Sequence, residues 1–200
     1  MARPKAFRED EVLDRAMRLF WQQGYEATSI QALVEQTGVN RASLYGAFGD
    51  KHGLFLAAVD RYLATVSAER QAILDRPGSA RAALEAYFED LIAFSLGSGR
   101  RLGCLITNAA IELAPRDRQT EERLRESLSR VEDAFYRLLR RAQSQGELAA
   151  ERDARALARF FTGLVQGLRV VARLDPQEDR LRDIVETGLS LIGPPSARLH

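Results

Sequence analysis

The sequence lacks the residues and patterns on which several classes of protein depend. It has one cysteine and two histidines in 200 residues, which excludes an intramolecular disulfide framework and leaves no Cys/His metal-ligand cluster. No apolar run approaches the ~18 residues of a membrane-spanning helix. The first ten residues, MARPKAFRED, lack the apolar core of a signal peptide. The simplest interpretation is a cytoplasmic protein with no membrane span, no metal and no cofactor.

Catalytic constellations are missing as well. No Cys/His pair and no glycine loop suited to cradling a phosphate stands out. His52 is expected to be solvated or to face a phosphate rather than to act in catalysis. An enzyme would need a carboxylate pair in a pocket, and the sequence isolates no such pair. We therefore expect no catalytic residues and no enzymatic activity.

Basic and acidic residues are nearly equal in number. The formal net charge is +1, and the first 60 residues carry seven Lys and Arg against eight Asp and Glu. Overall charge therefore does not indicate a strongly basic surface for nucleic acid. The local exception is an N-terminal arm with Arg3, Lys5 and Arg8, which could reach phosphates or a minor groove. A solvated tail is the alternative interpretation of this arm.

The most informative stretch is Thr28–Phe48, which reads TSIQALVEQTGVNRASLYGAF. Thr28 or Ser29 can cap a first helix, and Gly38 can end it in a left-handed conformation. Asn40 can then cap a second helix. The apolar residues of both halves recur at helical intervals: Ile30, Leu33, Val34, Leu44, Tyr45 and Phe48. Two short helices around a tight turn form a helix-turn-helix, which places the second helix in the DNA major groove. An ordinary helical hairpin is the alternative.

The remaining chain is helical by period, with no alternating strand pattern and no internal repeat. Asp50 can cap the helix that follows the helix-turn-helix, and breaks at Pro and Gly separate the later ones. The predicted helices are Gly53–Leu74, Ala80–Leu96, Leu102–Ala114, one through Leu124–Ala142 that ends near Gly146, Ala154–Arg173 and Glu178–Ile192. The pattern predicts an all-α fold of about nine helices.

A run of landmarks with consistent spacing extends over residues 1–62: Leu19-Phe20, Gly24-Tyr25, Thr28-Ser29-Ile30, Thr37-Gly38-Val39, Leu44-Tyr45, Phe48, Asp50-Lys51 and Leu54-Phe55. With these landmarks, residues 1–62 resemble the N-terminal domain of the tetracycline-repressor (TetR/AcrR) family of transcription factors. The resemblance implies a three-helix DNA-binding domain, placed here at 1–52, and a larger helical ligand-binding and dimerisation domain at 53–200. It also implies a homodimer that represses transcription and leaves a palindromic operator when a small-molecule effector binds.

One departure from this family pattern concerns the end of the recognition helix. Gly46 and Ala47 stand where many relatives carry bulky side chains, so contacts from that turn are in doubt. Arg41 can pair with guanine O6 and N7, and Lys51 near helix N–H groups suits a phosphate. A helical adaptor that kept the fold and lost DNA binding stays open as an alternative. The expected DNA contacts are Ser29, Gln31, Arg41, Ser43, Tyr45 and Lys51, with core packing as the alternative for Tyr45.

The last two helices are the predicted dimer interface. Gly163 and Gly167 lie four residues apart on one face, and paired small residues let another helix approach closely. Two such helices from each subunit would form a four-helix interface about a two-fold axis. The alternative is that both helices complete the core of one protomer. The expected interface residues are Phe160, Gly163, Leu164, Gly167, Leu181, Ile184, Val185 and Gly188.

An effector pocket is expected among the helices of the larger domain, lined by apolar side chains with a few polar ones. The candidates are Leu91, Phe94, Cys104, Thr107, Asn108, Ile111, Phe135 and Phe161, with Glu112 as a second polar anchor and core packing as the alternative for each aromatic. The run Arg101–Asn108 resembles a branch of the family that senses electrophiles or oxidants through a cysteine. Arg100 and Arg101 would favour the reactive thiolate of Cys104. Ordinary packing of a buried thiol is the other interpretation.

Overall fold

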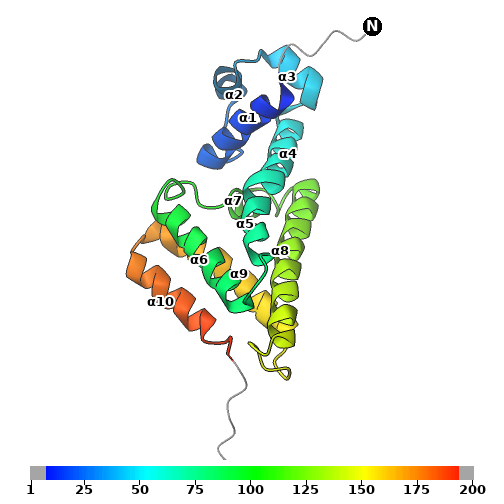
Figure 1. Cartoon of the computed structure of the whole chain (residues 1–200). Helices are drawn as coiled ribbons and strands as arrows, with labels where there is room; N and C mark the ends of the chain where they lie inside the picture. Colours follow the sequence, from blue (N-terminus) through cyan, green and yellow to red (C-terminus); the bar gives the residue numbers. More distant parts are fainter. Residues whose placement is uncertain (1–7, 194–200) are drawn as a thin grey trace, which may run out of the picture. The chain divides into compact units, whose positions relative to one another are not determined.

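The computed structural model describes residues 8–193, and every regular element within them is helical (Figure 1). Because α4, the π-helical turn η1 and α5 follow one another without a break, they count as one helix. The described residues then hold nine helices, which confirms the predicted all-α class and number. The elements are α1 (Glu9–Gln23), α2 (Ile30–Thr37), α3 (Arg41–Phe48), α4 (Lys51–Tyr62), η1 (Leu63–Ser67), α5 (Ala68–Leu74), α6 (Ala80–Leu96), α7 (Leu105–Glu112), α8 (Arg118–Ser144), α9 (Ala154–Leu174) and α10 (Glu178–Leu189).

The ends of the first helices confirm the predicted capping residues. The side chains of Ser29, Asn40 and Asp50 each accept a hydrogen bond from the N–H three residues on, at 3.0, 2.9 and 2.7 Å. Each cap satisfies an N–H that the first helical turn leaves without a partner. Thr28 has another role, since its hydroxyl donates to a backbone carbonyl of the preceding turn at 2.5 Å. Gly38 has φ +73°, the left-handed conformation expected at the end of α2.

Two predicted helix starts are wrong, and a third start, which the sequence left open, is given by the structure. The helix after the helix-turn-helix starts at Lys51, directly after its cap, and takes a π-helical pattern at Leu63–Ser67 that apolar spacing does not reveal. The α7 helix starts later than predicted, because the chain before it is folded into turns in which Gly103 has φ +63°. The α8 helix, predicted through Leu124–Ala142 without a stated start, begins at Arg118, since the preceding Asp117 accepts hydrogen bonds from N–H groups of its first turn. It ends at Ser144, close to the predicted end near Gly146.

The chain divides into two compact units. The N-terminal unit comprises the residues up to Ser67 together with Cys104–Leu124, and the second unit comprises Ala68–Gly103 and the residues from Arg125 on. This division, which is based on contacts, differs from the expected boundary between domains at 1–52 and 53–200. That domain boundary stays a prediction. The difference arises because α7 contacts α1 and α4, and Arg123 near the start of α8 pairs with Asp60 of α4.

In the N-terminal unit, aromatic rings join α1 to α4. Phe20 and Phe55 meet edge to face at 5.1 Å between ring centroids, and so do Trp21 and Tyr62 at 4.9 Å. All four side chains are buried, and edge-to-face aromatic pairs add to the stabilisation from buried apolar area. This pairing gives the helix-turn-helix a rigid support.

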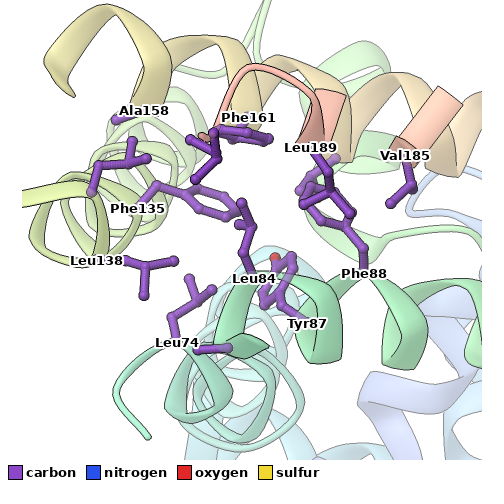
Figure 2. Close-up of a cluster of buried hydrophobic side chains, with 14 of the residues drawn as sticks. Leu74, Leu84, Tyr87, Phe88, Phe135, Leu138, Ala158, Phe161, Val185 and Leu189 are labelled. Carbon is purple, nitrogen blue, oxygen red and sulfur yellow. The ribbon is translucent and has the colours of Figure 1, made fainter. Parts of the chain in front are cut away.

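The second unit is organised around an aromatic cluster that α6, α8 and α9 share (Figure 2). Tyr87 and Phe88 of α6 pack against Phe135 of α8 at 5.2 and 6.4 Å between centroids, and Phe161 of α9 lies 5.8 Å from Phe135. The α10 helix adds Leu181, Val185 and Leu189 to the same core. Burial of these large side chains is the main contribution to the stability of this unit.

None of the helices between residues 8 and 193 combines the length and apolar character that crossing a bilayer requires. The basic arm expected at Arg3, Lys5 and Arg8 lies mostly outside the described residues. Arg8 alone is described; it is exposed and pairs with Glu11 at 3.1 Å.

Candidate DNA-binding site

The two helices of the site are held by buried residues on their inner faces. Leu33 of α2, Val39 of the turn and Leu44 of α3 are all buried, with exposed fractions of 0%, 9% and 1%. Val39 is thus buried in the turn between the two helices. With its inner face held in this way, α3 presents the other side to solvent, where Arg41 and Gly46 are exposed. This is the geometry of a helix that can enter a groove.

The three expected contacts on α3 lie within its first two turns. Arg41 is exposed and Ser43 and Tyr45 are half-buried. The guanidinium carbon of Arg41 lies 5.0 Å from the ring centroid of Tyr45, one turn away. This cation–π contact orients the arginine along the helix without occupying its hydrogen-bond donors. Arg41 can therefore still donate to a base edge.

The two expected contacts on α2 are exposed but already have partners in the protein. The Ser29 hydroxyl accepts the capping bond at the start of α2, and its own proton remains available to a phosphate. The Gln31 amide donates to Glu35 on the next turn at 2.8 Å. A DNA contact from Gln31 would have to compete with this hydrogen bond.

Lys51 is the first residue of α4, directly after the predicted cap Asp50, and its side chain lies over the ring of Tyr25. Its ammonium is 4.3 Å from the Tyr25 ring centroid and 3.4 Å from the carbonyl oxygen of Glu26. Burial raises the pKa of Tyr25, and the carboxylates of Glu26, Asp50 and Asp117 raise that pKa further. The surroundings of Lys51 are therefore negative, which offsets part of the positive charge that a phosphate would meet.

His52 corrects the expectation from the sequence. Instead of standing in solvent, its Nε2 lies 2.5 Å from a carboxylate oxygen of Asp117, 65 residues further along the chain. The Thr120 hydroxyl donates to the same carboxylate oxygen. A carboxylate of α7, that of Glu112, accepts hydrogen bonds from two backbone N–H groups of the turn between α1 and α2. From the sequence, Glu112 is expected in an effector pocket, and no sequence pattern marks Asp117.

The pair of His52 and Asp117 gives a prediction on acid stability. Burial raises the pKa of Asp117, but hydrogen bonds from Thr120 and His52 lower it more, so the pKa lies below the ordinary value. A depressed carboxyl pKa adds stability above the unfolded-state value of about 3.9, and that stability is lost as the pH falls through the folded-state pKa. We expect Asp117→Asn to lower the free energy of unfolding by about 1 kcal/mol near neutral pH and by less in acid.

Urea unfolding of both proteins at neutral pH and at about pH 3 measures this difference. The exposed Asp183→Asn is the matched control, and it should change the free energy of unfolding little at either pH. A difference between Asp117→Asn and wild type that grows as the pH falls would contradict the assigned role of Asp117.

The residues expected to line an effector pocket fall in both compact units. Leu91, Phe135 and Phe161 belong to the core of the second unit, each with 0% of its surface exposed. Phe94 is half-buried beneath the guanidinium of Arg70, which lies 5.0 Å from its ring centroid. These contacts describe side chains that pack within one protomer, and the effector pocket stays a prediction.

The other four pocket candidates belong to the N-terminal unit. Cys104 is 2% exposed and its Sγ lies 3.7 Å from the Tyr62 hydroxyl. Thr107 and Asn108 are half-buried, whereas Ile111 is 73% exposed. Burial slows the access of electrophiles to a thiol. Sensing through Cys104 therefore stays a prediction, with packing as its alternative. Among residues 8–193 no group of three or more His, Cys, Asp or Glu side chains is arranged to hold a metal ion.

The expected dimer residues divide by exposure. Phe160, Gly163 and Gly167 of α9 are exposed, and Leu164 and Ile184 are half-buried. Three residues of α10 contribute to the protomer itself: Leu181 and Val185 are buried in its core, and Gly188 packs against Leu164. Two further apolar side chains, Val170 and Leu174, are 45% and 81% exposed and continue the α9 row at helical spacing.

Together, the α2–turn–α3 geometry and the exposed outer face of α3 define a helix-turn-helix DNA-binding protein. Two family models match the chain: "Bacterial regulatory proteins, tetR family" over residues 12–58 and "Tetracyclin repressor-like, C-terminal domain" over residues 78–187. The chain belongs to the TetR family of transcriptional regulators.

Relatives of similar length support this assignment. The uncharacterised HTH-type transcriptional regulator YezE of Bacillus subtilis is 38% identical over 193 residues, which are 96% of this chain and 100% of that protein. The HTH-type transcriptional repressor ComR of Escherichia coli is 35% identical over 190 residues, or 94% and 90% of the two chains. A solved structure of the regulator CifR with substituted cysteines, in complex with operator DNA, is 34% identical with a TM-score of 0.85, covering 96% and 100%. DNA-binding transcriptional regulation is the shared function.

Proposed function

We propose that this regulator is a homodimeric repressor that binds a palindromic operator through α3 and leaves it when a small-molecule effector binds. The observation that carries the proposal is the solvent-facing side of α3, where Arg41 is exposed and Ser43 is half-buried, while Leu44 on the inner face is buried. The relative CifR is described in complex with a 26-base-pair operator, and ComR is described as a repressor. Both descriptions support the same role for this chain.

The proposed dimer uses the exposed row of α9. Its members are small or apolar, and an apolar row exposed on one helix face is a surface that association would bury. A two-fold axis through such a row would place two copies of α3 in successive major grooves, with half-sites roughly 34 Å apart or at a multiple of that spacing. The row comprises Phe160, Gly163, Gly167, Val170 and Leu174.

Release by an effector follows from linkage. In one conformation of the dimer, the spacing of the two recognition helices does not match the operator. An effector that prefers this conformation weakens DNA binding, and bound DNA weakens effector binding by the same factor. The polar candidates of the pocket, Thr107 and Asn108, are half-buried on α7. The effector class that suits the expected lining is a bulky molecule of low polarity.

Arg41→Ala tests the DNA-binding role. Loss of one bidentate pair with guanine costs about 1–3 kcal/mol, so affinity for the operator should fall about 5- to 150-fold. Preference at the contacted base should also relax. The probe is a DNA duplex that the wild-type protein selects from a random library, and fluorescence anisotropy at fixed salt gives the affinity.

Arg130→Ala removes an exposed arginine of α8 and serves as the matched control. It should leave the affinity unchanged within about twofold, because the charge it removes lies outside the candidate site. Equal losses in both variants would contradict base recognition by Arg41. A wild-type protein that retards no DNA at low salt would instead favour the helical adaptor.

A further inference from the structure

The connection between α7 and α8 contacts the helix-turn-helix at both of its ends. Glu112 is the last residue of α7 and Asp117 immediately precedes α8. One carboxylate holds the turn that leads into α2, and the other holds the first turn of α4, which follows α3. We refer to Glu112 and Asp117 together as the two-carboxylate clamp. All of the contacts lie within the N-terminal unit.

The first half of the clamp is a carboxylate that receives two backbone N–H groups. Glu112 accepts from Tyr25 at 2.9 Å and from Glu26 at 2.8 Å, each with a different oxygen. Gly24 leaves room for this carboxylate: its φ is +82°, and a Cβ there would lie 2.9 Å from a Glu112 oxygen. Hydrogen bonds to a charged acceptor are stronger than neutral ones. The turn is therefore attached to α7 at a defined position.

The second half of the clamp is a carboxylate that serves two helices. One oxygen of Asp117 accepts from the N–H of Gln119 at 3.1 Å at the start of α8. Its other oxygen contacts the His52 ring on α4 and the Thr120 hydroxyl. The side chain that begins α8 thus also fixes the beginning of α4. A displacement of the start of α8 must therefore either carry His52 with it or break this contact.

The held elements reach the recognition helix over short distances. Tyr25 packs on Phe55 at 5.0 Å between centroids and supports Lys51. Three residues separate Tyr25 from Ser29, the cap of α2, and three separate His52 from Phe48, the last residue of α3. Little chain is available at either end to absorb a displacement. The orientation of α3 therefore depends on where the clamp holds these two points.

We infer that the two-carboxylate clamp is a positioning device for DNA binding, through which the α7–α8 connection controls the orientation of the recognition helix. The inference rests on the proposed use of α3 in operator binding. Glu112 and Asp117 touch no DNA in this scheme. They act through Tyr25, Glu26 and His52. Loss of either carboxylate should therefore weaken specific operator binding, which depends on the orientation of α3. Contacts with phosphates that depend on charge alone should be unaffected.

Glu112→Gln tests this inference. The variant keeps the length of the side chain, but its amide nitrogen cannot accept, so one of the two backbone bonds is lost. We expect the affinity for the selected operator duplex to fall about tenfold. Binding to a random duplex at low salt should not fall, because the variant removes a negative charge and phosphate contacts are unaffected.

Glu122→Gln is the matched control, because it makes the same change in charge at an exposed site of α8. It should leave operator affinity at the wild-type value. Hydrogen exchange supplies a separate readout: the amides of Tyr25 and Glu26 should exchange faster in Glu112→Gln while those in the core of the unit keep their wild-type rates.

Four results separate the outcomes. Wild-type operator affinity in Glu112→Gln overturns the clamp, and so does an equal loss of specific and random-duplex binding with a lowered melting temperature, which indicates general destabilisation. A wild-type protein that selects no DNA sequence overturns the proposed function and the clamp with it. A selective loss of operator affinity with faster exchange at Tyr25 and Glu26 supports the inference.

Discussion

Replacing Gly167 with arginine is expected to dissociate the proposed dimer and to weaken operator binding by about 100-fold or more. Gly167 is exposed in the middle of the α9 row, and a Cβ there would meet no atom of its own protomer within 4 Å. A charged side chain buried against its two-fold mate costs several kcal/mol, since it loses its hydration without gaining a partner. A monomer presents one recognition helix and keeps only one half-site.

The fold of the protomer should tolerate the change. Glycine in a helix interior is less favourable than other residues by about 1 kcal/mol, so an arginine at this exposed position stabilises α9 locally. Analytical ultracentrifugation gives the mass in solution, and anisotropy with the selected duplex gives the affinity. The control is Ala72→Arg at an exposed position of α5, which should stay dimeric. A Gly167→Arg protein that remains a dimer would place the interface on another surface.

Phe135→Ala should lower the free energy of unfolding by about 3–5 kcal/mol, which reduces the folding equilibrium constant by about 150- to 5,000-fold. The ring is 0% exposed and lies within 6.4 Å of three other rings, measured between centroids. Truncation removes the transfer free energy of the ring and leaves a cavity that three helices cannot easily close. The same variant distinguishes core packing from pocket lining, the two interpretations that the sequence left open for Phe135.

Urea unfolding followed by circular dichroism measures the effect on Phe135→Ala at fixed protein concentration. Ile111→Ala is the comparison, because that side chain is 73% exposed and its truncation should change the free energy by no more than about 0.5 kcal/mol. A cost below about 1 kcal/mol for Phe135→Ala would show that the ring makes little packing contact, as expected for a side chain that borders an existing cavity. The ring would then be better described as the wall of a pocket.

The capping residues show how much of the fold is accessible from the sequence. Ser29, Asn40 and Asp50 begin α2, α3 and α4, and Gly38 ends α2 in the left-handed region, all as predicted. A capping bond joins residues no more than three apart, so its chemistry is complete within a few letters of sequence.

The neighbouring residues Phe160 and Phe161 show what local sequence cannot predict. Phe161 is fully buried among the rings of α6 and α8, while Phe160 is 43% exposed on the α9 row. The helical spacing of apolar residues places Phe160 and Phe161 on one wide apolar face of the helix. It does not determine which part of that face packs against the protomer core. Likewise Leu181 and Val185 were expected at a dimer interface and are buried within the protomer. The choice depends on which helices pack together.

The sequence by itself determined the all-α class, the helix-turn-helix and the caps that frame it, because these depend on hydrogen bonds and apolar spacing within one or two helical turns. Only the tertiary structure decided that Glu112 binds the backbone of Tyr25 and Glu26, 87 and 86 residues earlier, and that Asp117 pairs with His52. No local pattern marks a carboxylate whose partners are supplied by another helix. Those partners exist only once α1, α4 and α7 have packed together and brought the two turns within hydrogen-bonding distance.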